Sequence, residues 1–478
     1  MKKQFIYIIF SLVTLTFVSC SKWLEVQPED KITEDQVYSS PQNIYDALNS
    51  IYVNIGKPAL YGQDLTMTFV EILAQQYNVA TSHIFYPFAQ YNYADKKVLD
   101  TTESIWTNAY SNIAGANNFI ETLGKYPGVI PQKQEDILIG EAIALRAFLH
   151  FDLLRLFGPI YNSADSTKPS IPYYRKISSN YNPYLPANAV IDSILQDIST
   201  AQAYLSNDPV ITNGSAGDEA DNTFFQNRNY RMNYYALKAL EARVQLYRGN
   251  KAAALDAAKF VINNAQDKFP WITSNKILSE KNSPDRVFST ELLFGAMYTS
   301  LYNVQQNIYD QNLQDANILA PLDGRLKAVY EDPTYPNDFR YTPMWIAPNV
   351  TSKTYKTFYK YADVADVKKS FRFTIPLIRI SEMYYIVAEC EPDAATAVGY
   401  LNTVRFNRGI PDLAATVNVT TEIRKEYMKE FYGEGQLFYY YKRTKAATIP
   451  NGAAATGNIA MNATKYVVPV PQSETNFH

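Results

Sequence analysis

The chain has 478 residues, of which 47% are hydrophobic and 19% are charged, a composition typical of a globular protein and not of a disordered one. The formal net charge of −3 and the lack of a basic patch give no reason to expect nucleic-acid binding. The chain contains 39 Tyr but only 4 Trp, and tyrosine combines an apolar face with a polar tip that suits hydrated recognition surfaces.

The N-terminus has the pattern of an export signal. Lys2 and Lys3 precede an apolar run from Phe5 to Val18, which is short for a membrane-spanning helix. A small residue then stands directly before Cys20, as at a bacterial lipoprotein cleavage site. We therefore expect residues 1–19 to be removed and Cys20 to carry lipid, which would anchor the chain to a membrane. The alternative is an ordinary signal peptide with an incidental cysteine.

Apolar residues at helical spacing predict four helix pairs along the chain. Ser40 and Pro41 form a typical helix start, and Gly158-Pro159 ends a helix that is apolar nearly all round. The expected pairs are 41–54 with 103–124, 134–157 with 188–206, 232–248 with 251–264, and 377–390 with 392–407.

The third pair has the clearest pattern. Its first helix places Ala236, Leu240 and Val244 on one stripe, and Gly249-Asn250 then interrupts the period as a glycine-based helix end does. Two helices joined by so few residues must fold back on each other. The pattern partly matches a tetratricopeptide-type unit, which must stack on other pairs to bury its outer face.

Two long stretches interrupt the helical pattern. Residues 56–101 and 267–378 are rich in Tyr, Pro and Asn, and we expect loops with short strands at 292–294 and 373–375, followed by a helix from Leu377. Long irregular stretches inside a helical protein are commonly functional.

The sequence contains no recognisable catalytic motif, so we expect a protein that is not an enzyme and has no cofactor. Of the three histidines, we expect His150 to be a core residue and His83 a surface polar group. Asp218, Glu219 and Asp221 could hold calcium, but they lack the full spacing of a calcium loop, and a solvated loop is favoured. The lone Cys390 is expected to be a buried, inert thiol.

Several segments, in order, resemble the SusD/RagB family of outer-membrane lipoproteins. The resemblance covers Cys20 to the C-terminus, and its motifs are Trp23-Leu24-Glu25, Ala47–Tyr52, Glu141–Phe148, Asp338-Phe339-Arg340, Arg379–Glu389, Arg405–Gly409, Glu430–Gly435 and Pro469–Asn476.

The resemblance implies a mainly α fold in which about four tetratricopeptide-like helix pairs support a loop-rich, ligand-binding half. The implied parts are a lipoprotein signal peptide (1–19), an N-terminal region with helix pairs (20–266) and a C-terminal region with the ligand-binding excursion and the last pair (267–478). It also implies binding of an oligosaccharide nutrient, and delivery of that nutrient to a SusC-like TonB-dependent outer-membrane transporter. A peptide cargo, as in RagB-type lids of such transporters, is the alternative. Surface exposure on the outer membrane is implied too, although no dense acidic run follows Cys20, so anchoring in the periplasmic leaflet remains open.

Aromatic side chains interleaved with amides are the candidate ligand contacts. Aromatic rings stack on the apolar faces of sugars, while amides and carboxylates pair with their hydroxyls. We expect such contacts from Tyr86, Tyr91, Asn92, Tyr93, Tyr298, Tyr302, Tyr309 and Trp345. The alternative for each ring is loop packing or contact with the transporter.

Overall fold

The computed structural model describes residues 33–178, 180–218, 223–350 and 353–476. The expected signal peptide, Cys20, Glu219 and Asp221 lie outside these residues. Within them, no helix combines the length and the apolar character needed to cross a membrane.

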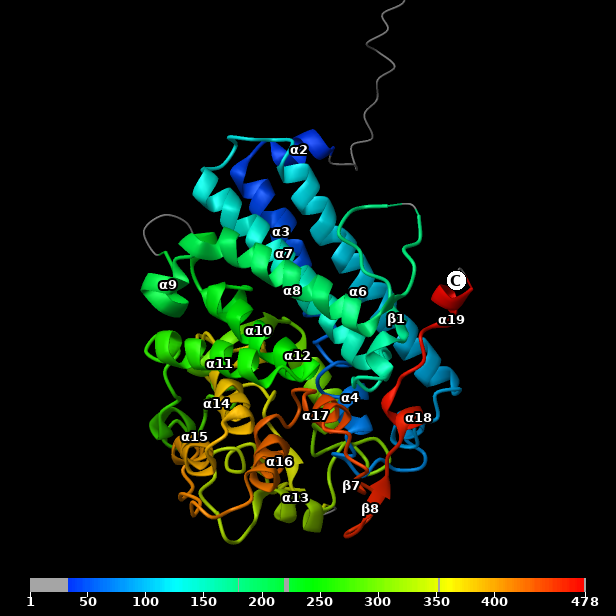
Figure 1. Cartoon of the computed structure of the whole chain (residues 1–478). Helices are drawn as coiled ribbons and strands as arrows, with labels where there is room; N and C mark the ends of the chain where they lie inside the picture. Colours follow the sequence, from blue (N-terminus) through cyan, green and yellow to red (C-terminus); the bar gives the residue numbers. More distant parts are fainter. Residues whose placement is uncertain (1–32, 179, 219–222, 351–352, 477–478) are drawn as a thin grey trace, which may run out of the picture.

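The first helix pair consists of α3 (Pro41–Ile55) and α6 (Lys96–Leu123), which pack against each other (Figure 1). The predicted start of α3 is confirmed, because the Ser40 hydroxyl accepts a hydrogen bond from the Asn43 amide at 3.3 Å and Pro41 is the first helical residue. Helix α6 begins earlier than the predicted residue 103. Asp95 caps it by accepting from the Lys97 amide at 2.8 Å.

The second pair, α7 (Gln132–Phe157) and α8 (Ala187–Tyr204), forms the centre of the stack. Helix α7 packs against both α6 and α8, which is why it is buried nearly all round. Its C-terminal end is closed by the buried Lys442, whose ammonium group donates to the carbonyls of Arg155, Leu156 and Gly158 at 2.7–3.1 Å.

The third pair, α10 (Tyr234–Arg248) and α11 (Lys251–Ala265), turns at Gly249 as predicted, with a φ of 85° that favours glycine. Helix α11 packs on α14 (Ile380–Cys390), which pairs with α15 (Ala394–Phe406), and α16 (Val419–Glu430) packs against both helices of this fourth pair. The predicted scaffold of stacked helix pairs is thus confirmed.

The strands among the described residues form short antiparallel sheets of two strands each. The longest pairs β3 (Leu292–Met297) with β6 (Thr374–Arg379), so the predicted helix start at Leu377 is wrong: Leu377 belongs to the strand and the helix begins at Ile380. The other two-stranded sheets are β1 (Pro169–Ile171) with β2 (Leu185–Pro186), β4 (Trp345–Ile346) with β5 (Thr357–Phe358), and β7 (Thr448–Pro450) with β8 (Asn458–Ala460).

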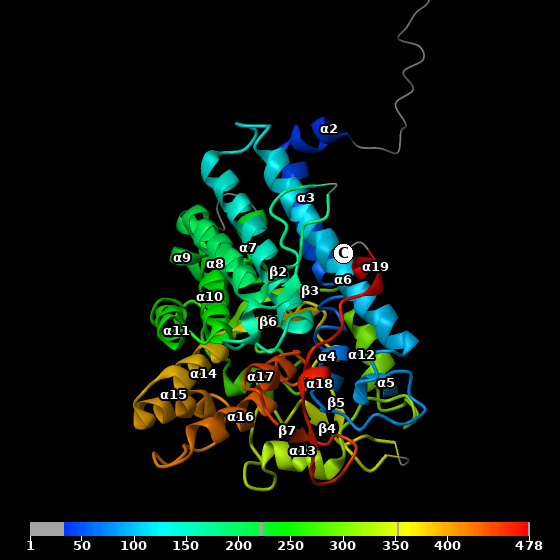
Figure 2. The ribbon, with the colours of Figure 1, turned by 45° about the vertical axis from the view of Figure 1, so that its right-hand side comes forward.

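Short helices connect these parts of the chain. They are α2 (Glu34–Tyr38), α4 (Phe69–Leu73), α5 (Tyr86–Ala89), α9 (Val210–Asn213), α12 (Leu301–Tyr309), α13 (Asp323–Tyr330), α17 (Leu437–Arg443), α18 (Ala463–Tyr466) and α19 (Gln472–Thr475). The C-terminal segment runs from β8 through α18 to α19, which lies beside α6 (Figure 2).

A buried network of ion pairs holds the irregular half to the last helices. Glu426 binds Arg340 at 2.6 Å and Arg405 at 2.9 Å, while Arg408 joins Glu291 and Glu430, each at 2.6 Å. All of these residues are at most 2% exposed. Removing one partner from such a network would leave an uncompensated buried charge.

Candidate functional site

A cleft of about 440 Å³ opens beside α5, within the range of small-molecule sites. Two parts of the chain that are far apart in sequence form it: the segment that leads into and through α5, and the C-terminal segment around β7 and β8. The lining residues are Gln75, Tyr77, Asn78, Val79, Ala80, Thr81, Tyr86, Ala89, Gln90, Tyr91, Asn451, Ala453, Ile459 and Lys465.

The cleft combines an aromatic surface with amides that can bind a ligand. Tyr86 is half-buried, the Asn78 side chain is partly exposed and Gln90 is exposed. Among the residues that the structure describes, none forms a hydrogen bond with the side-chain amide of Asn78 or of Gln90, or with the Tyr86 hydroxyl. These groups are therefore available to hydrogen-bond a ligand lying over the Tyr86 ring.

Other side chains hold the walls in place. The Tyr91 hydroxyl donates to the Leu73 carbonyl at 2.7 Å, and Gln75 donates to the Ala89 carbonyl at 2.9 Å. The Tyr93 hydroxyl donates to the Lys465 carbonyl at 2.6 Å, which ties the α5 region to the C-terminal segment. Burial raises the pKa of Tyr91 and of Tyr93, so both phenols are neutral at physiological pH.

Lys465 is the one charged residue among the described residues that line the cleft. Lys465 donates to the Ala460 carbonyl at 2.7 Å, and its ammonium nitrogen lies 5.3 Å from the centre of the Tyr91 ring. Of the described residues that line the cleft, none is acidic. The lining therefore suits a ligand rich in hydroxyl groups and does not select for a basic one.

The structure brings together only some of the predicted contacts. Tyr86 and Tyr91 line the cleft, whereas the neighbouring Asn92 is exposed and Tyr93 half-buried without lining it. Tyr298 and Tyr302 are half-buried elsewhere, before and within α12.

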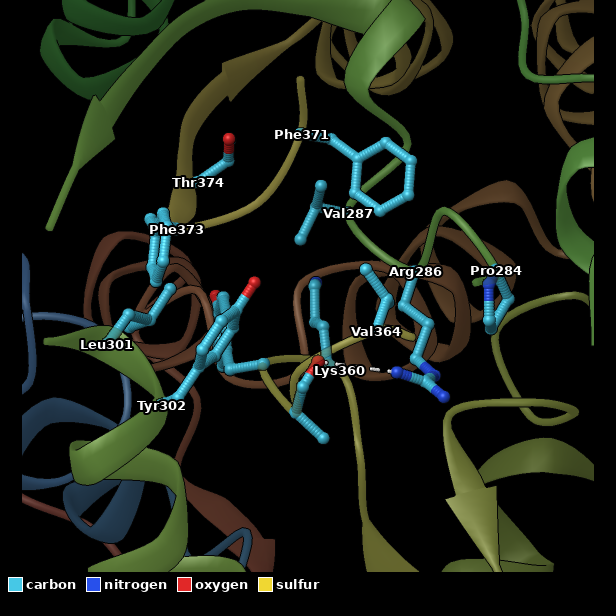
Figure 3. Close-up of a pocket in the computed structure, with 12 residues that line it drawn as sticks. Pro284, Arg286, Val287, Leu301, Tyr302, Lys360, Val364, Phe371, Phe373 and Thr374 are labelled. Carbon is cyan, nitrogen blue, oxygen red and sulfur yellow. Dashed lines mark hydrogen bonds between the residues drawn. The ribbon is translucent and has the colours of Figure 1, made fainter. Parts of the chain in front are cut away.

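Tyr302 faces a different and much smaller cavity (Figure 3). Tyr302, Leu301 and Phe373 lie on one side of it and Arg286 on the other. The Tyr302 and Phe373 ring centres are 4.6 Å apart, and the Arg372 guanidinium lies 5.3 Å from the Tyr302 ring. The cavity measures about 20 Å³, which has room for a water molecule but not for a sugar ring.

The expectation that Tyr309 and Trp345 contact a ligand is corrected by their burial. Tyr309 is 0% and Trp345 3% exposed. Tyr309 donates to the Met67 carbonyl at 2.9 Å, and Trp345 donates from its indole to the Tyr330 hydroxyl at 3.2 Å. Their rings pack in the core, where no ligand can stack on them.

Sequence patterns did not point to Gln75, Asn78, Asn451 and Lys465. These residues reach the cleft through long-range contacts, such as the 2.9 Å hydrogen bond from the Asn78 backbone N–H to the Ala320 carbonyl. No periodicity or motif marks them, because isolated loop amides and lysines are common on any surface.

The histidines have structural roles. His150 is buried as predicted: one ring nitrogen lies 2.9 Å from the Arg146 carbonyl and the other accepts from the Tyr174 amide at 3.2 Å. Burial lowers its pKa to about 3, so the ring is neutral. The prediction that His83 is a surface group is wrong, since His83 is 6% exposed and accepts from the Phe85 amide at 3.0 Å.

Cys390 is half-buried, and burial raises its pKa to about 11, as suits an unreactive thiol.

Two family models match different parts of the chain. A family described as starch-binding and associating with the outer membrane matches residues 22–220, and the SusD family matches residues 342–477. The SusD-like protein P38 of Formosa agariphila is 26% identical over 287 residues, which is 56% of this chain and 48% of the relative. The match thus spans about half the length of that curated relative.

Solved structures share the fold over most of the chain. A SusD superfamily protein from Bacteroides thetaiotaomicron is 22% identical with a TM-score of 0.72, covering 91% of this chain and 98% of its own. A SusD-like carbohydrate-binding protein from Bacteroides vulgatus has a TM-score of 0.70 at 17% identity, covering 92% and 96%. A laminarin-binding SusD-like protein has a TM-score of 0.67 at 18% identity, covering 92% and 98%. At these identities, the likeness establishes a common fold.

Proposed function

We propose, on the premise that this chain belongs to the SusD/RagB family, that it captures an oligosaccharide nutrient in the cleft beside α5 and delivers it to a partner TonB-dependent outer-membrane transporter. The observation that carries the proposal is that the partly exposed Tyr86 ring shares one cleft with the side-chain amides of Asn78 and Gln90, which have no hydrogen-bond partner among the described residues. An aromatic face beside amides is the arrangement that the apolar face and the hydroxyl groups of a sugar require. The name of the laminarin-binding structure also supports a glycan as the cargo.

The membrane anchor is part of the same proposal. Lipid on Cys20 would hold the protein on the outer membrane, and the described residues contain no membrane-crossing helix. Labelling with palmitate in the native host should mark the wild-type protein and not a Cys20→Ala variant. The variant should be recovered in the soluble fraction.

Ligand binding is tested by calorimetric titration with a panel of oligosaccharides, including fragments of starch and laminarin, and with a mixture of peptides. Tyr86→Ala and the double change Asn78→Ala/Gln90→Ala should each weaken binding of the glycan by about tenfold, because each removes a stacking face or two hydrogen bonds. Asn303→Ala is the matched control, since Asn303 is an exposed amide outside the cleft and its loss should change nothing. Binding of peptides alone would replace the glycan with the peptide cargo of RagB-type lids.

The transporter partner is tested separately. Purification of the wild-type lipoprotein from outer membranes in mild detergent should recover a TonB-dependent transporter in near-equal amount. Recovery of the lipoprotein by itself, under conditions that preserve other membrane complexes, would contradict the lid role.

A further inference from the structure

A second, larger cavity of about 580 Å³ lies between α6, the segment after β1 and α19. Its lining comes from three parts of the chain that are far apart in sequence. The lining residues are Glu103, Trp106, Thr107, Tyr110, Ser111, Ile113, Ala114, Asn117, Tyr174, Lys176, Ile177, Ser178, Asn180, Tyr181, Ser473 and Glu474.

Aromatic rings form one side of this cavity: Tyr110 and Tyr174 are half-buried, and Trp106, which is 3% exposed, supports Tyr110 from the core. The Trp106 and Tyr110 ring centres are 4.8 Å apart, and the Tyr110 and Tyr174 ring centres are 5.7 Å apart at an angle of 81°. The Tyr181 side chain, which also lines the cavity, is 54% exposed. The rings of Tyr110, Tyr174 and Tyr181 are therefore the aromatic surfaces that a ligand in the cavity could reach.

Hydrogen bonds set the orientation of this wall before any ligand arrives. The Trp106 indole donates to Glu474 at 3.3 Å, and the Tyr110 hydroxyl donates to the Pro172 carbonyl at 2.9 Å. Asn117 donates to the Tyr174 carbonyl at 3.1 Å. Because these rings are already held in place, a ligand would not have to order them, which lowers the entropic cost of binding.

The polar lining points to a ligand rich in hydroxyl groups. Thr107, Ser111, Ser178 and Asn180 are exposed at the cavity and are uncharged, and Lys176 is exposed as well. The carboxylates of Glu103 and Glu474 also line the cavity, and each accepts a hydrogen bond from a neighbouring side chain, Ser473 and Trp106 respectively. A cavity of this size, with half-buried aromatic rings and neutral hydroxyl and amide groups, fits one or two sugar units.

We propose that this cavity is a second carbohydrate-binding site, which binds a further part of the same chain that the cleft beside α5 captures. This inference rests on the proposed function. The C-terminal segment passes from one site to the other, since Lys465 in α18 lines the cleft and Ser473 in α19 lines the second cavity. Figure 2 shows the run of this segment from α18 to α19. Eight residues of chain span at most about 29 Å, at about 3.6 Å per residue, so the two sites lie within the reach of a long oligosaccharide.

Two linked sites have a measurable consequence. A ligand long enough to occupy both gains affinity from the high effective concentration of its second end, whereas a short ligand binds each site independently. The protein should therefore prefer long chains, and a disaccharide should bind at two separate sites.

The test uses the full chain, purified in mild detergent, and titrates it with malto-, laminari-, cello- and xylo-oligosaccharides from disaccharide to octasaccharide. Ala114→Arg would fill the cavity from the exposed surface of α6 without disturbing the core, and Tyr181→Ala would remove the exposed ring. Asn118→Arg, an exposed change one turn further along α6 and outside the cavity, is the control.

Ala114→Arg and Tyr181→Ala should each reduce affinity for the octasaccharide by about tenfold or more, and Ala114→Arg should reduce the number of disaccharide sites from two to one. Asn118→Arg should do neither. Cleft-dependent glycan binding that both cavity variants leave unchanged would overturn the second site and leave the proposed function intact. Occupation of the cavity by a peptide would also overturn it, and failure of the wild-type protein to bind any of these glycans would overturn both proposals.

Discussion

The phenol oxygens of Tyr77 and Tyr309 lie 2.6 Å apart, and both are within hydrogen-bonding distance of the Met67 carbonyl, at 3.1 and 2.9 Å. Tyr77 lines the cleft beside α5, and Tyr309 is the last residue of α12, 232 positions further along the chain. The two buried hydroxyls therefore join the cleft to the irregular half of the protein. Tyr309 thus supports Tyr77 in the cleft lining and is itself too deeply buried to contact a ligand.

Replacing Tyr309 with Phe tests this supporting role. The change removes the hydrogen bond to Met67 but leaves Tyr77 able to donate to the same carbonyl, so the free energy of unfolding should fall by about 1 kcal/mol. Urea denaturation measures the loss, and affinity for the glycan should stay within about twofold of wild type. Tyr298→Phe is the control, because the Tyr298 hydroxyl has no partner among the described residues.

Replacing Trp345 with Ala should destabilise the protein and leave the cleft unchanged. The Trp345 ring is 3% exposed and packs on Phe358 and Tyr432, with ring centres 4.7 and 4.8 Å away. Emptying this space should cost about 3–5 kcal/mol of unfolding free energy, measured by denaturation. The milder Trp345→Phe change should cost less. Glycan binding lost at undiminished stability would show instead that the ring contacts the ligand.

The buried ion pairs predict that removing a single charge strongly lowers the free energy of unfolding. Burial alone would raise the pKa of Glu430, but the guanidinium groups of Arg408 and Arg379 lower it well below its usual value. Glu430→Gln leaves these cations uncompensated and should cost about 3–5 kcal/mol of unfolding free energy. The pair of the half-buried Arg372 and the exposed Asp363 lies nearer the surface and is the comparison, and Asp363→Asn should cost less than about 1 kcal/mol.

The same pKa shift determines the response to acid. A carboxyl group whose pKa is lowered in the folded state stabilises the fold above its unfolded-state pKa, and this contribution is lost as the pH falls through the folded-state value. The wild-type protein should therefore lose stability in acid more steeply than Glu430→Gln. Parallel curves of unfolding free energy against pH for the two proteins would contradict this account.

Glu71 should have the opposite dependence on pH. Burial raises its pKa from 4.5 to about 8; one carboxyl oxygen accepts from the Gly435 amide at 2.8 Å, and the other has no hydrogen-bond partner among the described residues. A raised pKa means that the folded state holds a proton that the unfolded state has released. Its stabilising contribution is therefore complete below pH 4.5 and is lost as the pH rises to about 8.

Glu71→Gln imitates the protonated acid at every pH. The wild-type protein should match this variant near pH 5 and become less stable than it by roughly 2–4 kcal/mol near pH 8. Urea denaturation at a series of pH values measures the difference. A difference that does not change with pH would show that Glu71 is ionised in the folded protein.

Local signals in the sequence were enough to predict the scaffold. The Ser40-Pro41 start and the Gly249 turn follow from backbone chemistry that acts within a few residues, and the structure has both. The predicted helix start at Leu377 was wrong, because the residues there fit a strand as well as a helix. Thr374–Arg379 is a short apolar run beside a helix, and only its pairing with β3 makes it a strand.

The candidate site could be predicted only in part. Tyr86 and Trp345 are both aromatic residues in loop-rich segments, and nothing in their neighbours along the chain distinguishes a ring at a cleft from a ring in the core. The difference comes from distant partners: Trp345 is covered by Tyr330, Phe358 and Tyr432, whereas Tyr86 faces a cleft completed by residues near position 451.

By itself, the sequence determined the helix pairs, their turns and the family to which the chain belongs, because these depend on periodicity, on capping and on motifs that are read locally. Only the tertiary structure decided which of the aromatic side chains are exposed and which amides lie beside them. Burial is a property of contacts between segments as far apart as Tyr77 and Tyr309, and no pattern within either segment encodes it.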